Sequence, residues 1–348
     1  MRSKRVLVAC HEELVPPPSI EGLSDEEISD WRTEFDVITT LEDLGHEVLT
    51  VGMGDDIELL RTRIEAFRPH IVFNMLVEFL GAASYDQHIP SWLELHQTPY
   101  TGCNPRGMTL ARDKALSKKI LAWHGIRVPA FCVFRRGRKD RRPDRVTFPL
   151  FVKSLNEEAS LGISRASIVK SERELEKRVA FVHERVGTDA IAEEYIEGRE
   201  LYVGVLGNER LRAFRPWELH IPNLPPDAPN IATRRLKWDI RHQRELGVAN
   251  RLAEGLGVAK ERELARIARD TYRALGLSGY ARLDLRMRPD GRVYVLEANP
   301  NPDLTFGEDF AEGAEAAGIA YEELLARILG LGLAYRAEWK AEPAPILS

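Results

Sequence analysis

The side chains best suited to chemistry lie in one predicted β-hairpin near the C-terminal end of the chain. Arg282 and Asp284 are two residues apart in its first strand, and Glu297 and Asn299 are two residues apart in its second. Residues two apart share a face of a strand, so the members of each pair point the same way. The Asp290-Gly291 dipeptide is typical of a two-residue turn, which places Asp284 opposite Glu297 and Arg282 opposite Asn299.

Two carboxylates that face each other across a ladder repel, so a cation must offset their charge. That cation is either Arg282 or bound metal. Leu283 and Leu285 indicate that the opposite face is buried, and residues 293–296 are all apolar, so both faces are expected to be covered. Buried carboxylates need partners, and oxygen ligands beside an amide suit Mg²⁺ rather than zinc. The alternative is that these acids lie on a solvated hairpin face.

Two lysines indicate an anionic ligand. Lys153 directly follows the apolar run 148–152, where a lysine is uncommon unless its ammonium has an anionic partner. Lys114 opens a predicted helix after Asp113. The short segment 156–162 is turn-like and could lay backbone N–H groups over phosphates. The alternative for Lys153 is a half-exposed strand position from which its side chain reaches solvent.

The elements that must position these residues begin with an alternation of strands and helices. Apolar patterns predict strands at 6–9, 48–51 and 71–76 and helices at 28–44, 57–67 and 92–95. Strands separated by helices pair in parallel with right-handed crossovers. We therefore expect an open parallel α/β domain over residues 1–107.

Two further units are expected, over residues 108–193 and 194–348. The first contains a helix at 113–124, a basic connector at 135–145 that we interpret as a solvated loop, and strands at 150–154, 163–169 and 190–196. The second contains a strand at 201–206, a helix at 261–275, the hairpin and a tail helix at 321–339. The fold class is α/β (α+β), with one parallel domain.

Composition excludes several classes of function. The chain has 348 residues, 44% of them hydrophobic, with a net charge of -5 and a pI of about 6.1. These values predict no nucleic-acid partner and no membrane. The three cysteines are scattered, and the first apolar run is too short for a secretory signal, so a cytoplasmic location is expected. No G-x-x-x-x-G-K-[ST] loop, dinucleotide fingerprint, G-x-S-x-G or H-E-x-x-H motif is present.

With these residues identified, the chain resembles the ATP-grasp superfamily, and within it the D-alanine–D-alanine ligases. The most specific similarity is R-x-D followed by E-x-N at the family's separation. Other motifs that match are PYTG at 99–102, DKxxxK at 113–118, PLFVK at 149–153 and EEYIEGRE at 193–200. The resemblance extends from the first strand to about Thr305 and implies an ATP-grasp fold.

The resemblance also implies a role for each candidate residue. The expected ATP contacts are Lys114, Lys153, Ser160, Gly162, Glu193, Tyr195, Ile196, Glu200 and Lys237, with 160–162 in a flexible lid loop. Two Mg²⁺ ions, replaceable by Mn²⁺, are assigned to Asp284, Glu297 and Asn299. Arg282, aided by the backbone N–H of Asp303, would stabilise the transferring phosphoryl group and a tetrahedral intermediate. The implied reaction activates a small carboxylate as an acyl phosphate, which an amine then attacks.

Departures from the family pattern concern the substrates. The loop HEELVPPPS keeps Glu12 and Glu13, either of which could meet the first substrate, but is stiffened by prolines, and residues 77–79 replace a His-Gly motif. Asp303 replaces a glycine, and Glu308-Asp309 aligns with the loop that binds the second substrate's carboxylate. Acids there repel a carboxylate and attract a cation. We hypothesise an amine substrate other than D-alanine, one that is cationic or lacks a free carboxylate.

Three alternatives remain at this point. If Glu308 and Asp309 point away from the substrate, the enzyme is a D-alanine–D-alanine ligase of peptidoglycan synthesis. A phosphotransferase that forms no amide would have the same metal site. A non-catalytic nucleotide-binding regulator would be expected to lack a magnesium ligand or a phosphate-binding lysine, and none is missing. A homodimer is expected only by analogy with the family.

Overall fold

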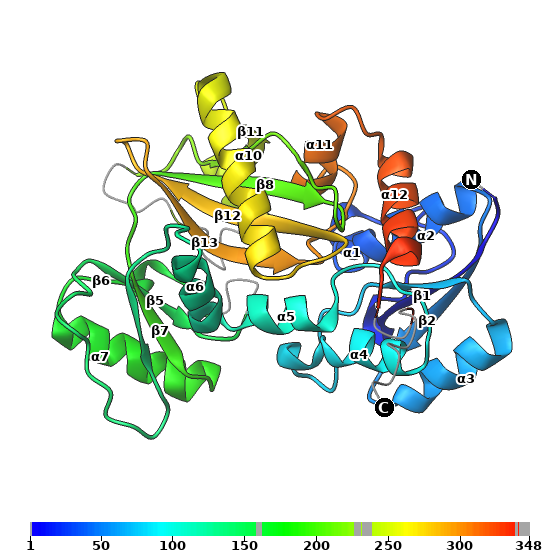
Figure 1. The fold of residues 1–348 in the computed structure, drawn as a ribbon, viewed down its shortest axis with the longest axis horizontal. Coiled ribbons are helices and arrows are strands. Elements are labelled where there is room, and N and C mark those ends of the chain that lie inside the picture. Colours follow the sequence, from blue (N-terminus) through cyan, green and yellow to red (C-terminus); the bar gives the residue numbers. More distant parts are fainter. Residues whose placement is uncertain (1, 158–161, 226–230, 232–238, 338–339, 341–348) are drawn as a thin grey trace, which may run out of the picture.

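Three β-sheets follow one another along the chain (Figure 1). The computed structural model describes residues 2–157, 162–225, 231, 239–337 and 340. One sheet is parallel and the other two are antiparallel, which confirms the mixed α/β class. Each sheet falls in one of the three predicted ranges, apart from Glu194 at the end of a strand of the second sheet.

The N-terminal sheet has the order β2-β1-β3. Its strands are β1 (Arg5–His11), β2 (Glu47–Met53) and β3 (Ile71–Asn74), and the accompanying helices are α1 (Asp25–Ile28), α2 (Arg32–Asp43), α3 (Ile57–Phe67) and α4 (His88–Leu95). Residues 6–10 of β1 are fully buried, as a central strand covered on both faces requires. The helix expected at 28–44 is α2, which begins only after Trp31, because a separate short helix, α1, capped by Ser24 with a capping box, ends at Ile28.

The second sheet is antiparallel, in the order β4-β7-β5-β6. Its strands are β4 (Phe131–Phe134), β5 (Leu150–Ser154), β6 (Ile168–Val169) and β7 (Ala190–Glu194), and its helices are α6 (Lys114–Trp123) and α7 (Glu172–Phe181). The strand expected at 163–169 is wrong over most of its length, because Arg165–Ser167 form a 3-10 turn. Lys153 lies in β5 and is 8% exposed.

The third sheet runs β11-β10-β8-β12-β13, with β9 beside β8. Its elements are β8 (Arg199–Leu206), β9 (Arg212–Ala213), β10 (Trp217–His220), β11 (Ala249–Leu252), β12 (Tyr280–Met287), β13 (Val293–Pro300), α9 (Ile240–Leu246), α10 (Gly257–Ala274) and α11 (Asp309–Glu315). On one face Leu201, Val203, Leu283 and Leu285 pack with Leu264 of α10. The predicted site residues of β12 and β13 are therefore on the other face.

The chain returns to the N-terminal sheet at its end. The tail helix α12 (Tyr321–Ala334) is shorter than predicted, and Trp339 lies outside the described residues. Leu324 and Ile328 of α12 pack with Val6 and Phe73 of the first sheet, and α12 lies beside α2 in Figure 1. A further helix, α5 (Pro105–Arg112), lies between the N-terminal sheet and the other two. Among the described helices, none is long and apolar enough to cross a membrane.

Candidate active site

The predicted hairpin is present, formed by β12 and β13. Asp284 faces Glu297 and Arg282 faces Asn299, as the sequence predicts. The side chain of Asp284 is buried, at 5% exposed, while those of Glu297 and Asn299 are partly buried. The acids are therefore enclosed by protein, and the alternative of a solvated hairpin face does not hold.

The predicted two-residue turn is wrong, although the pairing is right. The backbone N–H of Arg288 donates to the carbonyl of Arg292 at 2.9 Å, so the loop is one residue longer, with Gly291 at a φ of 83°. Beyond Asp284 the register shifts, leaving Leu296 as an extra residue in β13. The longer loop shifts the pairing of the two strands by one residue, and the extra residue of the β-bulge shifts it back. The two deviations cancel, so Glu297 stays on the site face.

Two buried lysines contact the acids around this bulge. Lys118, only 1% exposed, donates to the carbonyl of Leu296 and lies 3.2 Å from the carboxylate of Glu193. Lys153 lies 3.3 Å from Glu297 and 3.7 Å from Glu193. Burial lowers the pKa of Lys118; for Lys153 burial acts the same way, but Glu193 and Glu297 outweigh it and raise its pKa.

Arg282 is held on three sides. Its guanidinium donates two hydrogen bonds to Asp284, at 2.8 and 3.1 Å, and lies 3.0 Å from the carboxylate of Asp309. The ring of Tyr202 lies beneath it, with 4.9 Å between the guanidinium carbon and the ring centroid. Protein cations thus already offset both facing acids, Arg282 at Asp284 and Lys153 at Glu297.

The donor set also fits a metal that binds together with a nucleotide. Asp284, Glu297 and Asn299 share one face and provide carboxylate and amide oxygens. In the part of the chain that the structure describes, no three or more His, Cys, Asp or Glu side chains gather into a metal cluster. Magnesium typically takes one or two protein carboxylates and completes its shell with substrate phosphates and water, so two carboxylates and an amide suit it.

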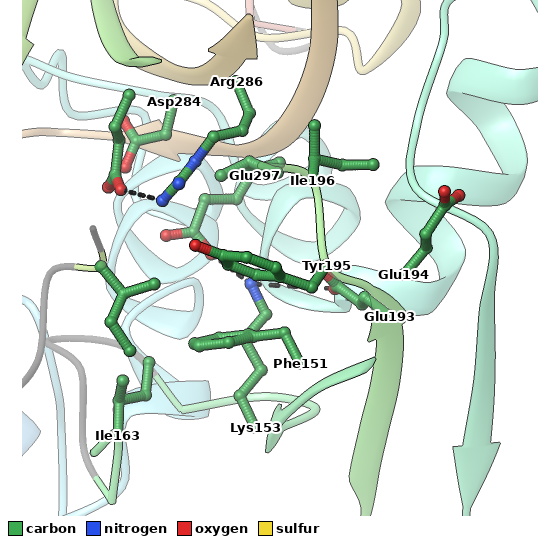
Figure 2. Close-up of a pocket in the computed structure, with 13 residues that line it drawn as sticks. Phe151, Lys153, Ile163, Glu193, Glu194, Tyr195, Ile196, Asp284, Arg286 and Glu297 are labelled. Atoms are coloured by element: carbon green, nitrogen blue, oxygen red, sulfur yellow. Dashed lines mark hydrogen bonds and ion pairs between the residues drawn. The ribbon is translucent and has the colours of Figure 1, made fainter. Parts of the chain in front are cut away.

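A pocket opens between the second and third sheets, beside the hairpin (Figure 2). It is lined by Phe151, Lys153, Ile163, Glu193, Glu194, Tyr195, Ile196, Glu200, Ile231, Asp284, Arg286, Leu296 and Glu297. Figure 2 shows Lys153, Tyr195, Arg286 and Glu297 pointing toward one another. Five of the predicted ATP contacts and two of the predicted metal ligands therefore meet in one pocket.

The other predicted ATP contacts are placed differently. Lys114 is buried and donates to the carbonyl of Glu157 at 2.7 Å, in the segment 156–162 that was expected to cover phosphates, and does not line this pocket. Gly162, at the end of that loop, accepts a hydrogen bond from Arg178 through its carbonyl. Ser160 and Lys237 lie outside the described residues.

Sequence reasoning missed two charged residues of the site, Lys118 and Arg286. Lys118 stands in the DKxxxK motif, but no role was assigned to it. Arg286 continues the period of two set by Arg282 and Asp284, and it lies directly opposite Glu200 in the β8–β12 ladder. The pairing of β8 with β12, which local patterns do not reveal, was the missing information.

One of the predicted ATP contacts, Tyr195, has its backbone N–H engaged within the protein: it donates to the carbonyl of Pro149 at 2.9 Å.

A second group of polar residues surrounds the turn after β13. The carboxylate of Asp303 accepts hydrogen bonds from Thr33 of α2 at 3.0 Å and from the backbone N–H of Thr305 at 2.8 Å. Asp309 is 8% exposed and paired with Arg282, so it is not available to repel a substrate carboxylate. Glu308, one residue earlier, is exposed. Of the two acids expected to repel a substrate carboxylate, only Glu308 is therefore placed to do so.

Glu34 was not predicted to belong to this group. It is 5% exposed, in the first turn of α2, at the edge of the sheet where the parallel strands end. No described lysine, arginine or histidine forms an ion pair with it. Burial, with a further contribution from Asp303, raises the pKa of Glu34 to about 7. The pKa of Glu308 is also raised to about 7, although its side chain reaches solvent. The main cause is that nearby protein atoms displace part of its water, and the charges of Asp303 and Asp309 add to the effect.

The candidates for contact with the first substrate are Glu12 and Glu13, which are exposed in the short 3-10 helix after β1. The carboxylate of Glu12 packs over Gly54, the residue that follows β2.

The two antiparallel sheets that enclose the charged pocket define the chain as an ATP-grasp protein. A D-alanine–D-alanine ligase from Bacillus anthracis, crystallised with ATP, superposes with a TM-score of 0.74 at 23% identity, over 97% of this chain and 100% of that one. The ligase from Coxiella burnetii superposes with a TM-score of 0.70 at 21% identity, over 96% of this chain and 95% of that one. These likenesses show the fold.

The sequence comparisons show the family. Residues 120–330, more than half of the chain, match the family described as D-ala D-ala ligase C-terminus. A D-alanine–D-alanine ligase from Syntrophotalea carbinolica is 31% identical over 317 residues, which cover 88% of this chain and 92% of the relative. The uncharacterized protein y4sG from Sinorhizobium fredii is 31% identical over 310 residues, 86% of each chain. The chain belongs to the D-alanine–D-alanine ligase family and is an ATP-dependent carboxylate–amine ligase.

Proposed function

We propose that this ligase joins a carboxylate to an amine acceptor that carries a positive charge and differs from D-alanine. The observation that supports the acceptor class is Glu34, a buried carboxylate without a described cationic partner, placed beside Asp303. An uncompensated buried carboxylate is costly, and an ammonium group on the substrate would offset it.

The nucleotide side of the site fits ATP with magnesium. Glu193, Tyr195 and Ile196 provide the edge of a pocket for the base, and Glu200 a carboxylate for the ribose. The buried ammonium of Lys153 supplies positive charge for a phosphate. Asp284, Glu297 and Asn299 would hold magnesium, which would neutralise charge on the phosphates of ATP.

Arg282 is suited to stabilise charge that develops during transfer. Its contacts with Asp284, Asp309 and Tyr202 fix the guanidinium before any substrate arrives. A fixed donor needs little reorganisation in the transition state, which is the main source of electrostatic catalysis. The carboxylate substrate would attack the terminal phosphate of ATP to give an acyl phosphate and ADP. The acceptor amine would then displace phosphate and lose a proton.

The acceptor side favours a cation. Glu34, Asp303 and Glu308 gather where α2 meets the turn after β13, and Arg32 is the nearby base besides Arg282. Asp303 contributes to the raised pKa of both Glu34 and Glu308 because like charges repel, so the group binds protons or a cation readily. A free α-carboxylate would meet the same field as repulsion. Diamines and basic amino acids or their derivatives are the acceptors that this chemistry selects.

A matched screen tests the proposal. Purified protein with ATP and magnesium is offered pairs of carboxylic acids and amines, and ADP, phosphate and the mass of the product are measured. We expect phosphate release only when an acid and a cationic amine are both present. If D-alanine alone drives ADP formation at millimolar concentration, the acceptor class is wrong and the enzyme is a D-alanine–D-alanine ligase. ADP formation with a phosphorylated product and no amide would identify a phosphotransferase instead.

A further inference from the structure

The nucleotide pocket contains a buried arginine that has no assigned role. Arg286 is 4% exposed and lies directly opposite Glu200 across the β8–β12 ladder. Its guanidinium donates to the carboxylate of Glu200, lies 3.4 Å from the carbonyl of Gly198, and is 5.8 Å from the ring centroid of Tyr195. Figure 2 shows it reaching into the pocket above Tyr195. It is therefore part of the pocket wall.

A buried ion pair does not by itself explain this arrangement. Removing two charges from water is expensive, and apolar side chains of similar volume stabilise a fold equally well or better. The opposite face of the same strands uses that solution, with Leu285 facing Leu201. A charged pair kept on the pocket side indicates a ligand that needs it.

The hydrogen bonds of Glu200 specify what that ligand offers. One carboxylate oxygen accepts from Arg286, and the other accepts from the hydroxyl of Tyr202 at 3.0 Å. A carboxylate oxygen has two acceptor sites, so each oxygen can take one more hydrogen bond. Two adjacent hydroxyl donors, as on a ribose, match this remaining capacity. Arg286 and Tyr202, the two protein donors, fix the orientation in which the carboxylate of Glu200 would meet the ribose hydroxyls.

We propose that Arg286 is a specificity-determining residue for the nucleotide: it orients Glu200 to select the ribose hydroxyls. This inference rests on the proposed nucleotide role of the pocket and adds a residue to it. If Arg286 only balanced the charge of Glu200, its loss would change stability but leave the preference for ribose unchanged.

The test compares nucleotides in the full-length protein. Calorimetry without acceptor measures binding of ATP, 2′-deoxy-ATP, 3′-deoxy-ATP and adenosine to the wild type, Arg286→Met and Arg292→Met. Arg292 is an exposed arginine of the same hairpin, paired with Asp290 at its tip, and serves as the matched control. In the Arg286→Met variant we expect ATP affinity to fall about tenfold and the preference for ATP over the deoxynucleotides to fall by a similar factor. The Arg292→Met variant should match the wild type.

A double variant separates specificity from folding. Removing both charges in Glu200→Gln/Arg286→Met avoids leaving an unpaired buried carboxylate, and this variant should unfold at a temperature close to that of the wild type. We expect it to bind ATP and 2′-deoxy-ATP about equally. A ribose preference that persists in both variants would overturn the inference while leaving the ligase proposal intact. Wild-type protein that binds no adenine nucleotide would instead contradict the proposed function itself.

Discussion

The nucleotide side and the acceptor side of the site meet at Arg282 of β12 but differ in how their acids are neutralised. On the nucleotide side each buried acid has a basic partner, as Glu193 has in Lys118, Glu297 in Lys153 and Glu200 in Arg286. On the acceptor side Glu34 is buried without such a partner among the described residues. The nucleotide side is preorganised before ligand arrives, whereas the acceptor side leaves negative charge for a substrate to offset.

The largest expected effect comes from removing the carboxylate of Glu297, a predicted magnesium ligand on the nucleotide side. Glu297→Gln should lower kcat by about a thousandfold, because phosphoryl transfer depends on metal charge held in place. Steady-state ADP formation measures it, with thermal unfolding as the check on folding. Glu315→Gln, an exposed site on α11, is the matched control. A variant with near-normal turnover would contradict the metal assignment.

The β-bulge offers the second test of the nucleotide side. Lys118→Met removes the donor to Leu296 and leaves the carboxylate of Glu193 with one cation fewer. We expect a loss of about 3–5 kcal/mol in the free energy of unfolding, because breaking a buried pair strands a charge. Urea denaturation measures it. The exposed neighbour Lys119→Met should lose less than about 0.5 kcal/mol; equal losses would show that Lys118 does not hold the bulge.

The contact between the two sides is the pair formed by Arg282 and Asp309. Asp309→Asn removes one of the charges that fix the guanidinium, and we expect kcat to fall about tenfold while the KM for ATP stays unchanged. Kinetics at saturating acceptor separates these parameters. Glu312→Gln, in the same helix, should behave as the wild type. A change in the KM for ATP instead would place Asp309 in nucleotide binding.

A change on the acceptor side should alter the affinity for the acceptor amine rather than the rate of the chemical step. Glu34→Gln removes the buried charge, so the KM for a cationic amine should rise about tenfold with little change in kcat. An isosteric neutral amine should bind the wild type and the variant alike. Glu42→Gln lies on the exposed face of the same helix and serves as the control. An unchanged KM for the cation would contradict the proposed acceptor.

Glu34 also makes the stability of the folded protein depend on pH. Because burial raises the pKa of Glu34 from its ordinary value of 4.5 to about 7, the native state holds its proton over this range while the unfolded state has lost it. The stabilisation is thus complete below pH 4.5 and is lost as pH rises toward 7. Thermal unfolding across this range should show Glu34→Gln losing less stability than the wild type. Identical curves would mean that Glu34 titrates normally.

The site was predictable where its residues follow each other in one strand or one hairpin. The period of two gave the face of Arg282 and Asp284, and the facing of Asp284 and Glu297 was predicted correctly. That success depended on a longer loop and a bulge that cancel, and no local pattern distinguishes this case from an unbulged hairpin. The helix expected at 28–44 is present but starts later than predicted, at Arg32, and the strand expected at 163–169 failed because a 3-10 turn interrupts it.

The sequence by itself determined the order of the elements and the chemistry of the hairpin, because both rest on residues near each other in the chain. The tertiary structure alone decided which distant residues complete the site. Pairing of β8 with β12 placed Glu200 opposite Arg286, and packing of α12 on the first sheet brought the turn with Asp303 beside Thr33 and Glu34. Such contacts depend on how whole elements bury their apolar faces, which local spacing does not encode.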